Sequence, residues 1–234
     1  MPRRYIFEHM LNARDLGGYA SARGGETRWR RFIRADSTHA LSPDEARALV
    51  EMGVTDVIDL RGAVETVRRP SALVNVPGLR YKSIPLAVDI ASLGIAPEEA
   101  NTGADYLGMA ENAHAVREIM SILADAEGIA LFHCTAGKDR TGIIAALLLL
   151  LAGVDEDDVV ADYMVSEWYI RRSMEGIRRL HPGMPEHYAR SRPAYMCGFL
   201  DLLRQKYGSV EAYLAAMGVS PETCGRLRDK LLEE

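Results

Sequence analysis

Residues 129–153 read IALFHCTAGKDRTGIIAALLLLLAG. The apolar run at 129–133 predicts a short buried strand, and a polar loop that contains Gly137 follows it. An apolar helix is then predicted from 140 to 152. Because the strand enters the loop and the helix leaves it, the N–H groups of the loop and the helix N-terminus point to one place. Such a place binds phosphate without needing side-chain charge.

Cys134 is the first residue of this loop and Arg140 is the last. Helix N-termini and nearby cations favour the thiolate form of a cysteine, so we expect Cys134 to be an ionised nucleophile. Since the loop is short, the Arg140 guanidinium can reach a group held above the sulfur, where its planar fork matches two phosphate oxygens. Lys138 is expected to add a point charge beside it, and Gly137 allows a tight turn.

The rest of the chain alternates predicted strands and helices before a helical tail, which indicates an α/β domain. Further strands are expected at 32–35, 54–60 and 81–86. Helices are expected after the N-cap residues Ser42 and Ser220, and over 105–125 and 155–172. The segment 89–101 is either a loop or a short helix, and 181–192 is expected to be a loop.

Composition sets the bounds of this interpretation. The length of 234 residues suits one domain, residues 1–234. A net charge of -5 provides no basic field for nucleic acid or anionic lipid. The longest apolar stretch, 143–152, is about half a membrane span, so no integral membrane segment is expected. Sparse cysteines and the lack of a signal sequence favour the cytoplasm, and the histidines have no metal-ligand spacing.

The segment HCTAGKDRTG, residues 133–142, resembles the H-C-x-x-G-x-x-R-[ST] signature of the protein tyrosine phosphatase superfamily. Its AGKDR core is similar to the bacterial and fungal tyrosine-phosphatase-like branch, which acts on phosphotyrosine and phosphoinositides. NARDLGGY at 12–19, VIDLRGAVE at 57–65 and the ending at 207–232 also resemble that branch. The resemblance implies a cysteine-phosphatase fold: a central mixed or mostly parallel sheet flanked by helices, with a helical C-terminal part.

The resemblance also implies a two-step mechanism that needs no metal and no cofactor. Cys134 attacks phosphorus, and water then hydrolyses the cysteinyl-phosphate. Arg140 and the loop N–H groups hold the phosphoryl group, Thr141 donates a hydrogen bond to the sulfur, and His133 orients the loop. The expected phosphate-binding residues are Thr135, Ala136, Gly137, Lys138 and Thr141.

The leaving group needs a proton, so a general acid is expected. The resemblance favours Asp139, inside the loop. Asp89 and Asp105 are alternatives because better-known relatives carry the acid on a separate loop, and Asp59 is a weaker option. Of the other charged residues, Arg14 is expected to pair with the neighbouring Asp15 and Asp59 with Arg61, as structural supports.

Several functional alternatives stay open. The expected substrate is a phosphorylated protein, carrying phosphotyrosine or phosphoserine and phosphothreonine, or a phosphoinositide. A catalytically silent phosphate-binding scaffold of the same fold is a different class, and a thiol oxidoreductase using Cys134 is a third. Export without an obvious signal is also open, and the sequence indicates no oligomeric state.

Overall fold

The structure is a computed structural model of the chain, and it describes residues 2–86, 102–180 and 182–232. The sheet in these residues has five strands in the order β1-β2-β5-β3-β4. Only β1 is antiparallel to its neighbour, and the other pairs are parallel. The strands are β1 (Arg14–Asp15), β2 (Phe32–Ala35), β3 (Val54–Asp59), β4 (Arg80–Ser83) and β5 (Ile129–His133).

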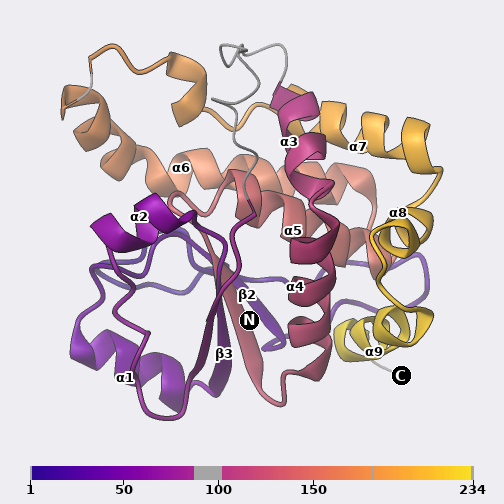
Figure 1. Cartoon of the computed structure of the whole chain (residues 1–234), viewed down its shortest axis with the longest axis horizontal. Coiled ribbons are helices and arrows are strands. Elements are labelled where there is room, and N and C mark those ends of the chain that lie inside the picture. Colours follow the sequence, from indigo (N-terminus) through magenta and orange to yellow (C-terminus); the bar gives the residue numbers. More distant parts are fainter. Residues whose placement is uncertain (1, 87–101, 181, 233–234) are drawn as a thin grey trace.

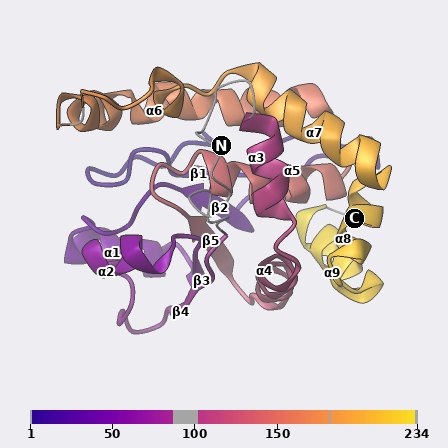
Figure 2. The ribbon, with the colours of Figure 1, turned by 45° about the horizontal axis from the view of Figure 1, so that its top comes forward.

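The sheet is covered on both faces, which explains why the central strand β5 is buried throughout. Side chains of β5 alternate between two cores: Leu131 packs on the side of α1, and Phe132 packs on the opposite side. Figure 2 shows α1 and α2 on one side of the strands, with α4, α8 and α9 on the other. The predicted α/β fold with a mostly parallel sheet flanked by helices is therefore confirmed.

Helix α5 lies in the middle of the helical layer and is buried along nearly its whole length. It is apolar all round because the sheet and neighbouring helices surround it. The helices are α1 (Pro43–Glu51), α2 (Ala63–Arg68), α3 (Thr102–Ala110), α4 (Ala113–Asp125), α5 (Asp139–Leu151), α6 (Glu156–Leu180), α7 (Pro193–Tyr207), α8 (Val210–Ala216) and α9 (Pro221–Leu231). Within the described residues, none of them combines the length and apolarity needed to cross a bilayer.

Most predicted elements lie where the sequence indicated, with several differences. The expected helix over 105–125 is two helices, α3 and α4, because the Asn112 side chain accepts a hydrogen bond from the N–H of Ala115 and caps α4. Strand β4 begins at Arg80 and ends at Ser83, and α6 continues to Leu180. The expected loop after α6 contains a short 3-10 turn, Glu186–Ala189.

The three central strands end at the same edge of the sheet. Ala35 of β2 and Asp59 of β3 both pair with His133, the last residue of β5. The segments that leave these strands therefore meet beside Cys134. In open α/β sheets this carboxyl edge is where ligands bind.

Candidate active site

The Cys134 loop, residues 134–140, is held from outside by its carbonyl groups. The Asn12 side-chain amide donates to the carbonyls of Ala136 (2.9 Å) and Gly137 (3.0 Å). The buried guanidinium of Arg34 also donates to the Gly137 carbonyl, at 2.8 Å. Turning these carbonyls outward leaves the N–H groups to face the interior of the loop.

Further contacts complete this arrangement. The carbonyl of Thr135 accepts from the N–H of Ser37 (3.2 Å), and that of Lys138 accepts from the N–H of Gly142 (2.8 Å). Within the described part of the chain, the backbone N–H groups of 135–140 find no acceptor. A run of such free N–H groups at a helix N-terminus is a binding site for an oxyanion.

Gly137 is required by both its conformation and its surroundings. Its φ of +65° lies in the left-handed region. A Cβ at this position would lie 2.6 Å from the carbonyl carbon and oxygen of Ala35 and from the nitrogen of Asp36. The loop therefore rests directly on the end of β2, and only glycine allows that approach.

Cys134 lies at the base of the loop, directly after β5, and is 1% exposed. Thr141, in the first turn of α5, is also buried, and its hydroxyl has no hydrogen-bond partner among the described residues. An unsatisfied buried hydroxyl is uncommon and marks a donor available for another group. The three cysteines Cys134, Cys197 and Cys224 are all free thiols.

The Arg140 side chain is held along one edge by a carboxylate. Its Nη1 donates to Oε2 of Glu65 at 2.5 Å, and its Nη2 donates to Oε1 at 2.9 Å. No bond from Nε is found within the described residues, so the edge formed by Nε and Nη2 is available to a second oxyanion. Burial disfavours the charge, but the Glu65 hydrogen bonds and the proximity of Cys134 raise the pKa of Arg140.

Glu65, in the first turn of α2, is a site residue that sequence reasoning missed. Besides Arg140, it accepts hydrogen bonds from the hydroxyl of Thr135 and, at 2.9 Å, from the N–H of Gly62. Burial opposes ionisation, but these bonds together lower the pKa of Glu65 to about 2. Its position three residues after Gly62 indicates a helix-capping role, whereas the contact with Arg140 depends on the tertiary fold.

The side chain of Lys138 does not point into the loop. Its buried ammonium donates to the carbonyls of Tyr188 (3.0 Å) and Arg190 (2.8 Å), and it lies 3.3 Å from Oδ1 of Asp139. A buried ammonium needs such acceptors, which explains the orientation. The predicted phosphate-binding role of Lys138 therefore depends on its backbone N–H and not on its side-chain charge.

Asp139 is the first residue of α5, and 36% of its side chain is exposed. The buried hydroxyl of Tyr106, on α3, donates a hydrogen bond to its carboxylate. Among the alternative acids, Asp105 also lies on α3. Burial raises the pKa of its carboxyl group, although the nearby His187 opposes this shift. Asp89 lies outside the described residues.

His133 is fully buried at the start of the loop. Its Nε2 lies 3.3 Å from the hydroxyl of Thr38 and 3.7 Å from a carboxylate oxygen of Asp59, and its Nδ1 lies 3.3 Å from the Cys134 carbonyl. Burial lowers the pKa of His133 to about 4, although Asp59 opposes the shift. Asp59 pairs with Arg61 at 2.6 Å, as the sequence predicted.

The expected pair between Arg14 and Asp15 is wrong. Arg14 instead pairs with Asp162 of α6 at 2.8 Å, and Arg34 pairs with the same carboxylate. Neighbouring residues on a strand point to opposite faces, so Arg14 and Asp15 cannot readily meet. Arg14 also bonds the Asn12 side chain at 2.6 Å, so this buried cluster supports the Cys134 loop.

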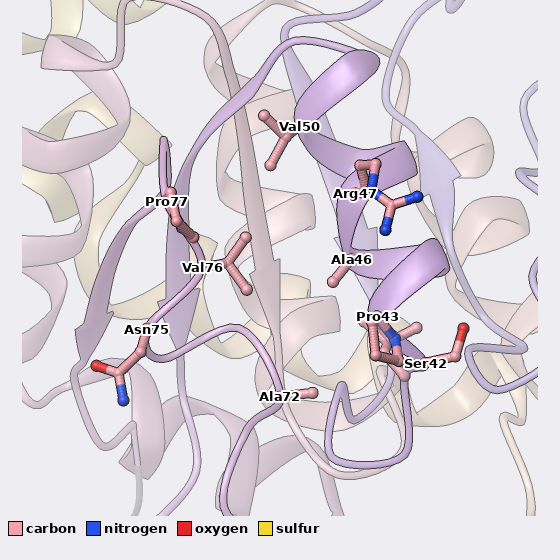
Figure 3. Close-up of a pocket in the computed structure, with 10 residues that line it drawn as sticks. Ser42, Pro43, Ala46, Arg47, Val50, Ala72, Asn75, Val76 and Pro77 are labelled. Carbon is pink, nitrogen blue, oxygen red and sulfur yellow. The ribbon is translucent and has the colours of Figure 1, made fainter.

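Among the described residues, two of the surface hollows lie near these elements. One, of about 450 Å³, reaches Thr135 and Glu65 and is also lined by His39, Arg68 and Arg69. The other, of about 480 Å³, lies between α1 and the segment 72–77, and Figure 3 shows its mostly apolar lining. Of these two, the first adjoins the Cys134 loop, and it brings arginine side chains close to that loop.

Comparisons with known proteins agree with this geometry. A family model described as "Tyrosine phosphatase family" matches residues 5–233. The chain is 32% identical over 216 residues to a tyrosine-protein phosphatase of Nostoc commune, covering 86% of this chain and 74% of that protein. It is 26% identical over 270 residues to the triple specificity protein phosphatase PtpB of Mycobacterium tuberculosis, covering 94% of this chain and 96% of that protein.

A solved structure is also similar. The crystal structure of TpbA from P. aeruginosa aligns with 81% of this chain and 89% of its own, with a TM-score of 0.42 and 18% sequence identity. The family model carries the assignment, because it spans nearly every residue from the N-terminal motif to the last helix. The chain belongs to the tyrosine phosphatase family, and it is a phosphatase.

Proposed function

We propose that the protein hydrolyses phosphate monoesters through a cysteinyl-phosphate intermediate. The Cys134 thiolate attacks phosphorus, an S–P bond forms, and the ester P–O bond breaks as Asp139 protonates the leaving oxygen. Water then attacks the cysteinyl-phosphate, with Asp139 accepting its proton, and inorganic phosphate leaves. Thr141 donates a hydrogen bond to the departing sulfur, and His133 orients the start of the loop.

One observation carries this proposal. The carbonyls of 135–138 are bonded outward, and the N–H groups of 135–140 have no acceptor in the described part of the chain. Donors fixed in this way stabilise the charge that develops on a transferring phosphoryl group, without reorganisation during the reaction. The free edge of Arg140 adds a charged fork to the same ring.

The proposed substrates are phosphotyrosine in proteins, with phosphoserine, phosphothreonine and phosphoinositides as further classes. The printed name of the Mycobacterium tuberculosis relative, a triple specificity phosphatase, supports breadth of this kind. Within the described residues, Arg68 and Arg69 form no ion pair, and both line the hollow beside Thr135. They give a chain of net charge -5 a local attraction for anionic substrates. The single domain of residues 1–234 and the cytoplasmic location stay predictions.

A turnover assay tests the proposal. Wild type is expected to release phosphate from p-nitrophenyl phosphate and to be inhibited by vanadate. Cys134→Ser should abolish turnover but retain binding, and Arg140→Ala should impair both. If wild type binds a phosphotyrosine peptide but releases no phosphate, the chain is instead a silent phosphate-binding scaffold.

The substrate class needs a second assay. Wild type and the double variant Arg68→Ala/Arg69→Ala are compared on a phosphotyrosine peptide, a phosphoserine peptide and a soluble inositol polyphosphate. We expect the double variant to raise KM most for the substrate with the largest negative charge, because rim charges act mainly on encounter. If the double variant changes KM by the same factor for every substrate, the two arginines do not take part in substrate selection.

A further inference from the structure

A chain of buried hydroxyl groups ends on the carboxylate proposed as the general acid. Tyr106 of α3 bonds Oδ1 of Asp139, and the hydroxyl of Tyr163, on α6, lies 2.7 Å from the Tyr106 hydroxyl. Tyr106 is 2% exposed and Tyr163 is 0% exposed. Helices α3 and α6 thus supply a chain of two hydroxyl groups that ends on a carboxylate oxygen of α5.

The direction of these hydrogen bonds follows from the chemistry of the groups. An ionised carboxylate only accepts, so Tyr106 must donate its one proton to Asp139. The Tyr106 oxygen must then accept from Tyr163. Burial, reinforced by the charge of Asp139, raises the pKa of Tyr106 and of Tyr163, so both remain protonated donors.

The two oxygens of Asp139 are therefore not equivalent. Oδ1 accepts from Tyr106 and lies 3.3 Å from the ammonium of Lys138. No partner for Oδ2 is found within the described residues. A proton added to Asp139 must go to Oδ2, because both neighbours of Oδ1 are donors.

We propose that Tyr106 and Tyr163 are positioning residues that commit Oδ1 of Asp139 to accepting hydrogen bonds and leave Oδ2 to protonate the leaving group. The inference rests on the proposed function and deepens it. As the S–P bond forms and the P–O bond breaks, the proton moves from Oδ2 to the departing oxygen. The resulting carboxylate is then held by the tyrosine hydroxyl and by Lys138.

Substrates with different leaving groups test the inference. Good leaving groups such as p-nitrophenol need little protonation, whereas phenol needs much more. The measured quantity is the ratio of kcat/KM for p-nitrophenyl phosphate to that for phenyl phosphate. This ratio is independent of the amount of folded enzyme, so a loss of stability does not alter it.

Tyr106→Phe removes only the hydroxyl. We expect it to raise this ratio roughly tenfold, the effect of one hydrogen bond to a charged group. Tyr163→Phe should raise the ratio less, because it acts through Tyr106. The matched control is Tyr213→Phe, which removes another buried hydroxyl, bonded to the Ala110 carbonyl at 2.6 Å, and should leave the ratio unchanged.

A double-mutant cycle identifies the residue through which Tyr106 acts. Asp139→Asn should raise the ratio by itself, and adding Tyr106→Phe should then change it no further. The inference is overturned if Tyr106→Phe slows both substrates equally, or if it still changes the ratio in the Asp139→Asn background. If Asp139→Asn leaves the ratio of an active enzyme unchanged, Asp139 is not the acid and the inference fails, whereas the role of Cys134 is judged separately by Cys134→Ser.

Discussion

At the scale of single residues, Arg140 combines structural support with the proposed binding of phosphate. Glu65 accepts from Nη1 and Nη2, whereas Nε has no partner within the described residues, so Nε and the second hydrogen of Nη2 are left for another oxyanion. A planar fork can bind oxyanions in bidentate fashion along more than one edge, whereas an ammonium group makes only single point contacts. The carboxylate fixes the orientation of Arg140 before any substrate arrives, so less conformational entropy is lost on binding.

Glu65→Gln tests this support. The change keeps the shape of the side chain but replaces an oxygen facing Arg140 by an amide, so one charge-assisted bond is lost. We expect kcat/KM for p-nitrophenyl phosphate to fall by about tenfold or more, measured by steady-state kinetics. Glu111→Gln is the control, since the Glu111 side chain bonds Lys206 and Tyr207, neither of which belongs to the Cys134 loop. Equal kinetics for Glu65→Gln and wild type would contradict the support role.

The lowered pKa of His133 predicts how the stability of the fold depends on pH. Its pKa is about 4 in the folded chain, because burial disfavours the charge, and about 6.5 when unfolded. Between these values the unfolded chain binds more protons, so acid destabilises the fold through this group. Relative to His133→Gln, wild type should lose up to about 3 kcal/mol of unfolding free energy from pH 7 to pH 4.

Urea denaturation at several pH values measures this difference. Asp36, whose pKa burial raises to about 6, has the opposite sign because its neutral form is favoured in the fold. It is present in both proteins, so its contribution cancels in the comparison. A difference that stays constant from pH 7 to pH 4 would show that His133 is not held neutral.

At the scale of elements, α3 places Tyr106 through a close helix contact. A Cβ on Gly103 would lie 2.7 Å from the carbonyl carbon of Gly198 on α7, whereas a Cβ on Gly198 would lie 3.7 Å from its nearest neighbour, the Cα of Gly103. The two glycines therefore differ in the space that each leaves for a side chain. Only Gly103 is required for the approach of the two helices.

Gly103→Ala should destabilise the protein by about 1–3 kcal/mol, because the added methyl forces α3 away from α7. Gly198→Ala should be neutral or should stabilise by up to about 1 kcal/mol through helix propensity. Chemical denaturation of both variants measures the two effects. Similar losses from both substitutions would contradict the asymmetric packing.

The elements also show how far sequence reasoning extends. Strands β2 and β5 were predictable because each is a short, mostly apolar run between polar segments. Helix α2 was not predicted, since its six residues are too few to show a helical period. The division at Asn112 was hidden because the helical periodicity continues through it. In the site, Cys134, Gly137 and Arg140 follow from local spacing, whereas the partners of Lys138, Glu65 and Arg14 depend on contacts between distant segments.

At the scale of the whole molecule, one buried carboxylate joins the N-terminal segment, the sheet and the helical layer. Asp162 of α6 pairs with Arg14 of β1 and with Arg34 of β2, and all three side chains are at most 2% exposed. Arg34 and the Asn12 partner of Arg14 in turn hold the Cys134 loop. The Cys134 loop is thus supported by residues from the N-terminal segment, the first two strands and α6.

Asp162→Asn should destabilise the protein by about 3–5 kcal/mol, because it leaves two buried guanidinium groups without a counter-charge. Glu156→Gln, also on α6, is the control, since its pair with Arg204 is exposed on both sides and should contribute less than about 1 kcal/mol. Thermal or urea unfolding measures both. If Asp162→Asn loses no more unfolding free energy than the control, Asp162 does not join these segments as described.

The proposal that phosphate passes through a covalent bond to Cys134 has a direct test. The enzyme is quenched in acid during turnover of p-nitrophenyl phosphate, digested and examined by mass spectrometry. We predict that the peptide carrying Cys134 gains the mass of one phosphoryl group, and that the adduct is absent in Cys134→Ser, which does not turn over. Continued phosphate release by Cys134→Ser, or a phosphoryl group found on another residue, would contradict the account.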